Sequence, residues 1–138
     1  MAVDWIKYRE QKVLFVDYAN FKAEEVLPQM RKAAELCNMS SRKVLLLANF
    51  ENVDLGKVSQ RNEILQEAYQ LGLNVFNEKT EKSAIIGMSG IKKMFYNLYV
   101  RFSKHEIKLF DSKQAALDYL VPEPSSKPFE GRRIAEST

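Results

Sequence analysis

The chain alternates between short segments with the composition of β-strands and longer segments with the apolar periodicity of helices. β-Branched and aromatic runs predict strands over residues 4–8, 12–18, 43–49, 83–88 and 107–110. Apolar spacing of i, i+4 and i+7 predicts helices over residues 23–37, 57–71, 91–102 and 111–120. This order favours an α/β fold with a mixed, mostly parallel sheet of about five strands, about four helices packed on its faces, and an N-terminal antiparallel hairpin.

Particular residues mark the ends of these elements. The run 43–49 is continuously apolar, which is typical of a central strand covered on both faces. Gly72 stands where a glycine commonly ends a helix, and Asp111 with Gln114 has capping-box spacing for the last helix. Three of the four prolines follow residue 121. We therefore expect one domain over residues 1–121 and a flexible tail over residues 122–138.

The composition is that of an ordinary globular protein, with 138 residues of which 46% are hydrophobic and 28% charged. No apolar run approaches the roughly 18 residues of a membrane span, and the N-terminus does not resemble a secretory signal. We expect a cytoplasmic protein without a membrane span. The net charge of +3 is modest, and the basic run from Lys92 to Lys104 favours a solvated helix face, so no nucleic-acid partner is expected.

Cys37 is the one cysteine of the chain, so it cannot form an internal disulfide. It lies on the apolar stripe of the helix predicted at 23–37. That position favours a buried thiol that packs as a small hydrophobic side chain.

The segment 83–102 predicts a buried strand that turns through Gly87 and Gly90 into an amphipathic helix. Backbone N–H groups and the helix dipole converge at such a turn, which is a common place for anions. The turn matches neither Gly-x-Ser-x-Gly nor the P-loop pattern. Ser89 is therefore better explained as a helix cap than as a nucleophile.

Other catalytic groups are scarce in the sequence. His105 is the only histidine, and its surroundings indicate an exposed loop rather than a catalytic triad. One histidine and one cysteine leave a zinc site without ligands. Asp17 and Glu51 follow strands, where carboxylates commonly serve turns and caps. We predict that the protein is not an enzyme and holds neither a metal nor a cofactor.

Four segments resemble the small bacterial STAS-like (SpoIIAA-like) family. They are residues 16–20, 46–53, 84–93 and 110–120, within a similarity that covers nearly everything but the tail. The resemblance implies a single-domain STAS-like fold, related to that of the anti-sigma factor antagonists and distantly to CRAL-TRIO lipid-transfer domains. It also implies a regulatory or protein-interaction module.

Anti-sigma factor antagonists switch by phosphorylation of a serine in an Asp-Ser-Ser-Gly turn. The matching turn here is Asp54-Leu55-Gly56, and no serine occupies the slot. Ser59 follows within the first turn of the predicted helix, without support from the motif. The resemblance therefore implies a module that lacks the phosphorylatable serine.

Two hypotheses of function follow. In the first, loops after the strands contact a protein partner, with the candidate residues Asn49, Asp54, Leu55, Gly56, Gly87, Ser89, Gly90, Lys92 and Lys93. In the second, a small apolar or anionic, lipid-like ligand binds between the sheet and the aromatic-rich helix at 91–102, although such a stripe is more often simply core. A homodimer is also possible, because an edge strand with Trp5 and Tyr8 can pair with its copy.

Overall fold

The computed structural model describes residues 3–88 and 107–123 of the chain. Five strands form one sheet in the order β1-β2-β3-β4-β5. The strands are β1 (Val3–Tyr8), β2 (Gln11–Asp17), β3 (Val44–Asn49), β4 (Thr80–Ile86) and β5 (Ile107–Phe110). β1 pairs antiparallel with β2, and the other neighbours pair in parallel. The predicted α/β class and the mixed, mostly parallel sheet are confirmed.

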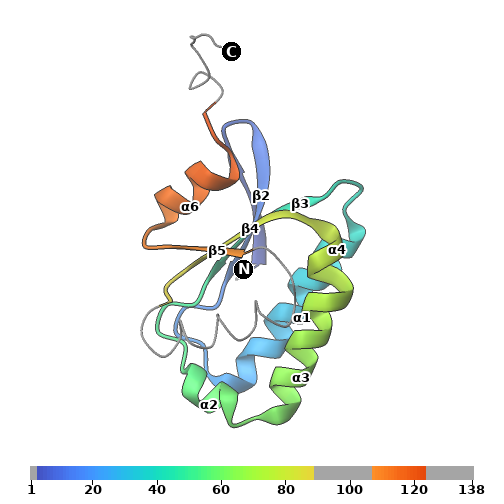
Figure 1. Cartoon of the computed structure of the whole chain (residues 1–138), viewed down its shortest axis with the longest axis vertical. Helices are drawn as coiled ribbons and strands as arrows, with labels where there is room; N and C mark the ends of the chain where they lie inside the picture. The colour runs from blue at the N-terminus through green and yellow to red at the C-terminus, as the bar shows by residue number, and fades with distance from the viewer. Residues whose placement is uncertain (1–2, 89–106, 124–138) are drawn as a thin grey trace.

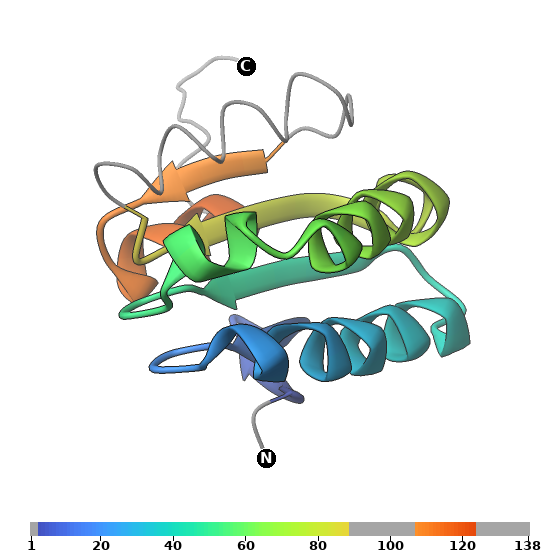
Figure 2. The same cartoon turned by 90° about the horizontal axis from the view of Figure 1, so that it is seen from below.

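Helices cover both faces of the sheet (Figures 1 and 2). α1 (Ala23–Met39), α2 (Leu55–Ser59) and α3 (Asn62–Leu71) lie on one face, and α6 (Lys113–Leu120) lies on the other. Each face has its own apolar core, and the core beneath α1, α2 and α3 is the larger. Leu14 of β2 and Leu47 of β3 are fully buried, as expected for central strands with both faces covered.

The hairpin between β1 and β2 closes with two residues, Arg9 and Glu10. Their φ angles of 49° and 69° are both positive, as a type I′ turn requires. This turn matches the right-handed twist of the two strands, so the predicted antiparallel hairpin forms without a glycine.

α3 ends at Leu71, as predicted, but Gly72 is not the left-handed glycine that commonly ends a helix, and that part of the prediction was wrong. The Gly72 backbone is helical, with φ −60° and ψ −49°. The chain continues through a π-type turn, η1 (Gly72–Phe76), and a last turn, α4 (Asn77–Lys79), directly into β4. Val75 and Phe76 in the continuation are buried in the larger core. Their burial outweighs the roughly 1 kcal/mol that glycine costs inside a helix.

The helix predicted at 57–71 is broken in two. α2 ends at Ser59 and α3 begins at Asn62. Val58 and Ile64 are both buried in the larger core. On one continuous helix these positions would lie about 120° apart, at the limits of a single apolar stripe. The break between the two helices lets both side chains enter the core.

The last helix is capped by Ser112, and the predicted capping box of Asp111 and Gln114 was wrong. The backbone N–H of Ala115 donates to Ser112 Oγ at 3.1 Å. Gln114 instead turns toward the hairpin, where its Nε2 donates to the hydroxyl oxygen of Tyr8 at 2.6 Å.

A polar network fixes α6 to the β1–β2 hairpin. The hydroxyl of Tyr8 donates to the Asp118 carboxylate, which also lies 3.1 Å from a guanidinium nitrogen of Arg9. Arg9 donates a second hydrogen bond, of 2.9 Å, to the backbone carbonyl of Val121. The hydrogen bond from Tyr8 holds the pKa of Asp118 below its usual value. The hydrogen bond from Gln114 and the positive charge of Arg9 act in the same direction.

Cys37 is fully buried, as predicted, and burial raises the pKa of its thiol to about 11. None of the helices in the described ranges is long and apolar enough to cross a bilayer. The helix predicted at 91–102 and the tail beyond residue 123 lie outside the described residues.

The Asp118 network predicts a pH-dependent contribution to stability. A carboxylate with a lowered pKa in the folded state stabilises the fold above its ordinary pKa, and this contribution disappears as the pH falls through the folded-state value. Asp118→Asn should therefore lower the urea midpoint at about pH 7 and lower it progressively less toward about pH 3. The exposed Asp111 offers the control: Asp111→Asn should shift the midpoint little at either pH. An equal loss at both pH values for Asp118→Asn would contradict the role assigned to its charge.

Candidate functional site

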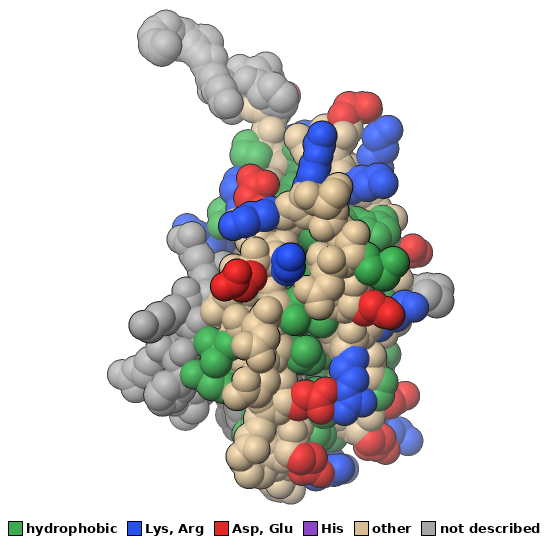
Figure 3. All heavy atoms as spheres, turned by 90° about the vertical axis from the view of Figure 1, so that its right-hand side faces the viewer, with side chains coloured by type: hydrophobic (Ala, Val, Ile, Leu, Met, Phe, Trp, Pro, Cys, Tyr) green, Lys and Arg blue, Asp and Glu red, His purple; other side chains and the backbone are tan. Residues whose placement is uncertain are grey.

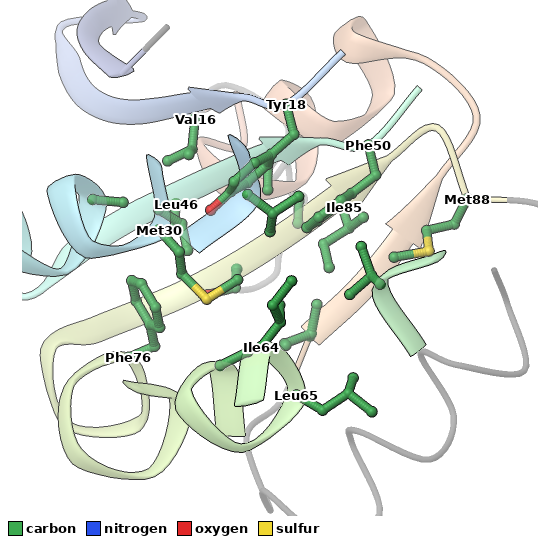
Figure 4. A pocket seen from close by; sticks show the side chains of 18 residues that line it. Val16, Tyr18, Met30, Leu46, Phe50, Ile64, Leu65, Phe76, Ile85 and Met88 are labelled. Atoms are coloured by element: carbon green, nitrogen blue, oxygen red, sulfur yellow. The ribbon is translucent and has the colours of Figure 1, made fainter. Parts of the chain in front are cut away.

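An apolar pocket of about 160 Å³ lies between the sheet and the helices α1 and α3 (Figure 4). Strands β2, β3 and β4 contribute one wall and the helices contribute another. None of the described lining residues is charged. They are Val16, Tyr18, Val26, Met30, Ala33, Leu46, Ala48, Phe50, Val58, Ile64, Leu65, Ala68, Phe76, Ser83, Ala84, Ile85, Met88 and Ile107.

Strand alternation and small side chains explain why a space exists here. Alternate residues of a strand face the same side, which brings Leu46 of β3 and Ile85 of β4 toward the helices (Figure 4). Ala33 of α1, Ala48 of β3 and Ala68 of α3 line the same space. Each alanine ends at its Cβ, so these positions leave volume that a longer apolar side chain would fill.

Two stacked aromatic rings border the pocket where β2 and β3 end. Tyr18 and Phe50 lie with ring centroids 4.6 Å apart and an interplanar angle of 10°. Phe21 packs edge-on against Tyr18, at 5.9 Å and 84°. Tyr18 is buried and supplies the oxygen seen in the lining in Figure 4. The backbone N–H of Tyr18 donates to the carbonyl of Asn49 at 2.8 Å, which ties this end of the pocket to β3.

A buried serine adds a second hydroxyl to the lining. Ser83 of β4 is 1% exposed, and its Oγ lies 3.4 Å from Oγ1 of Thr80. Thr80 in turn donates to the carbonyl of Phe76 at 2.6 Å. The pocket is therefore apolar with two hydroxyl-bearing residues, which suits an uncharged ligand better than an anion.

Asn49, one of the predicted partner residues, serves the internal structure. Its Nδ2 donates to Asp17 at 3.2 Å, and its Oδ1 accepts from the backbone N–H of Glu51 at 3.0 Å. The Asp17 carboxylate also accepts from the backbone N–H of Ala19 at 3.0 Å. Asp17 is thus a turn residue, as predicted, and Asn49 joins the loops after β2 and β3.

Asp54 and Gly56 lie at the start of α2. Asp54 caps this helix by accepting from the backbone N–H of Lys57 at 3.1 Å. Gly56 is exposed, and Leu55 is the first residue of α2. The sequence placed these residues at a turn before a helix, and the structure agrees.

Gly87 is required by close backbone contact. Its φ is +86°, and a Cβ built there would lie 2.4 Å from the backbone N of Glu51. The adjacent ladder continues past the strands, because the N–H of Phe50 donates to the carbonyl of Ile86 at 2.9 Å. The other predicted residues of this turn and the following helix lie outside the described residues. They are Ser89, Gly90, Lys92 and Lys93.

The sequence did not reveal the pocket as a space. The helical stripes correctly predicted that Met30, Ile64 and Leu65 face inward. Periodicity predicts which side of a helix faces the core, but it does not predict whether that side packs closely against the sheet. The small side chains of Ala33, Ala48 and Ala68 were the feature of the sequence that could have indicated an unfilled space. The ligand hypothesis placed a site between the sheet and the helix at 91–102. That helix lies outside the described residues, and the described lining comes from the sheet, α1, α2, α3 and η1.

Within the described ranges, no group of three or more His, Cys, Asp or Glu side chains is placed to hold a metal ion. Acidic and basic side chains are interspersed on the face shown in Figure 3. His105 lies outside the described residues.

Comparison with known proteins bears on the fold. No protein-family model matches the chain, and no curated protein was found to match it. Among solved structures, the chain is similar to an uncharacterized DUF3478 family protein with a SpoIIAA-like fold from Shewanella loihica PV-4. The similarity covers 86% of this chain and 92% of that chain, with 18% sequence identity and a TM-score of 0.56. This chain has a SpoIIAA-like fold.

The SpoIIAA-like fold that the resemblance implied is therefore confirmed, and the relation to CRAL-TRIO domains stays a prediction. In this SpoIIAA-like sheet the pocket lies on the face of α1 and α3, next to the loops after β2, β3 and β4.

Because of the close contact at Gly87, we expect that adding a single methyl group there strongly destabilises the fold. Gly87→Ala forces an L-residue to a positive φ and drives its Cβ into the backbone of Glu51. We expect a loss of at least about 2 kcal/mol in the free energy of unfolding, measured by urea denaturation. Gly56→Ala is the matched control, because its Cβ would meet only Asp54 Oδ1 at 3.3 Å, and it should change stability by less than about 1 kcal/mol. Equal effects of the two substitutions would refute the close-contact explanation.

Proposed function

We propose that this chain is a non-enzymatic STAS-like binding module whose pocket takes a small, uncharged, apolar ligand. The observation that carries the proposal is the apolar pocket of about 160 Å³ without a charged residue in its described lining. The described lining also offers no carboxylate, imidazole or thiol for acid-base or nucleophilic chemistry, which favours binding over catalysis.

The size of the pocket narrows the class of ligand. Apolar cavities of roughly 150 Å³ stay dry and admit a benzene-sized molecule, whereas drug-sized ligands occupy roughly 300 to 1,000 Å³. A single ring or a short branched chain therefore fits, and a long lipid chain does not. An anion would lose its hydration without a compensating cation in the described lining.

Methionine methyl groups provide a direct test. The chain has five methionines, of which Met30 and Met88 line the pocket and Met39 is 74% exposed on α1. Titration of 13C-methyl-methionine protein with toluene should shift the signals of Met30 and Met88, because an aromatic ring in the pocket changes their local field. The signal of Met39 should stay in place. Unmoved pocket signals, or equal shifts of all three, would contradict the proposal.

A substitution that fills the pocket provides the second arm of this test. Ala68→Leu should abolish the toluene-induced shifts without unfolding the protein, because the new side chain occupies the ligand volume. Ala115→Leu adds the same atoms at an exposed position of α6 and should leave the shifts unchanged. Persistence of the shifts in Ala68→Leu would show that toluene binds elsewhere.

The second candidate function is binding of a regulatory protein partner at the loops after β2, β3 and β4, here called the loop edge. Backbone contacts between these loops favour it. Asn20 N–H donates to the Glu51 carbonyl at 2.9 Å, and Gly87 packs against the backbone of Glu51. Three loops thus form one pre-organised surface, on which Glu51, Asn52 and Asp54 are exposed. A surface that is already ordered loses little conformational entropy on binding.

The partner hypothesis is tested by charge reversal on this surface. Glu51→Lys should reduce recovery of a co-purifying protein by at least about tenfold while leaving the melting temperature unchanged. Glu35→Lys reverses an exposed charge on α1 and should not affect recovery. Equal recovery with both variants would remove the loop edge as the contact surface.

A further inference from the structure

β1 lies at one edge of the sheet, with β2 on one side and no described strand on the other. In a hairpin closed by a two-residue type I′ turn, the two residues that flank the turn form a hydrogen-bonded pair. Here that pair is Tyr8 and Gln11. Hydrogen-bonded and non-hydrogen-bonded pairs alternate along antiparallel strands. Trp5 and Lys7 therefore direct their backbone N–H and C=O groups away from β2, to the open edge.

The side chains beside this edge include an exposed apolar surface. Trp5 is 36% exposed and Met39 is 74% exposed, and they are the exposed large hydrophobic residues of the described chain. Both line a groove of about 750 Å³ that runs from β1 across β2 and β3 to Glu81 of β4, and most of its other lining residues are polar or charged. Unpaired strand edges that adjoin exposed apolar side chains are sites of strand addition.

We propose that two copies of this chain associate through β1, which pairs antiparallel with β1 of the second copy about a two-fold axis at Ile6. The two sheets then join into one continuous sheet. This dimer does not depend on the pocket or on its ligand.

The register follows from the alternation of side chains. Residues that face each other across an antiparallel pair share a face of the sheet, so a symmetric pairing is centred on a residue. Centring on Ile6 sets Trp5 opposite Lys7 of the second copy, twice by symmetry. An indole beside an ammonium group is a favourable cation–π pair. On the other face, Ile6 meets Ile6 of the second copy.

Centring on Trp5 gives a poorer match. Lys7 would then face Val3, which is buried, and Asp4 would face the half-buried Ile6. Both charges would lie opposite apolar side chains. Lysine on an edge strand commonly prevents strand addition, and the register about Ile6 is the one in which Lys7 gains an aromatic partner.

Sedimentation of the full-length protein tests association. We expect a concentration-dependent rise from the 16.0 kDa of one chain to twice that mass over about 1 to 500 μM, the range of modest interfaces. Trp5→Thr keeps a strand-forming residue and should raise the dissociation constant by roughly tenfold through loss of both cation–π pairs. Trp5→Pro removes the outward N–H, which an edge strand tolerates, and should leave a folded monomer. A wild-type protein that stays monomeric throughout would overturn the proposal.

Cysteine cross-linking tests the register. Cys37 is the only native cysteine and is fully buried, so single introduced thiols report on the interface. Ile6→Cys should form a disulfide-linked dimer under mild oxidation, because residues on the two-fold axis lie opposite each other. Trp5→Cys should form at least about tenfold less of it. A dimer that cross-links through Trp5→Cys and not through Ile6→Cys would overturn this register.

Discussion

The close contact of Gly87 with the backbone of Phe50 and Glu51 holds together the part of the molecule where the pocket lies. A Cβ at residue 87 would lie 2.8 Å from Cα of Glu51, so the loops after β3 and β4 approach only because glycine stands there. The contact continues the β3–β4 ladder to Phe50. That fixes the Phe50 ring, which stacks on Tyr18 and borders the pocket. The shape of the pocket at this end therefore depends on one backbone contact.

The two faces of the sheet are stabilised differently, and this explains where a binding site can form. α6 has eight residues, which is too short for a stable helix by itself. It buries Ala116, Leu117 and Leu120 and gains its polar network with Tyr8 and Arg9. The opposite face carries α1 and α3, which are longer than α6, over a larger core. Alanines on its inward surfaces leave space without exposing the strands. An apolar pocket is compatible with stability on this face, because its larger core offsets the packing that is lost at the pocket.

Much of the fold could be predicted because it depends on local patterns. The β-type runs predicted each strand of the described residues within three residues of its ends. The stripe of Val26, Ala33 and Cys37 predicted the buried side of α1. The errors at Gly72 and at the break between α2 and α3 have one cause. A glycine and a helical period are local signals, and burial of Phe76 and Val58 by distant residues overrode them. Likewise, Ser112 replaced Asp111 as the cap while Gln114 bonded to Tyr8, more than a hundred positions away.

The candidate site was less predictable than the fold. Asn49 and Gly87 were recognised at strand ends and Asp54 at a turn before a helix, but in the structure each of them stabilises its own loop or helix. The pocket lies where the sheet meets α1, α2, α3 and η1, so no single segment encodes that space. The proposed function requires that the apolar space between the sheet and α1 and α3 admit a ligand. A crystal structure determined under xenon pressure tests this requirement: we predict xenon between Met30, Ile64 and Ile85, and side chains that fill this volume with no xenon present would contradict the proposal.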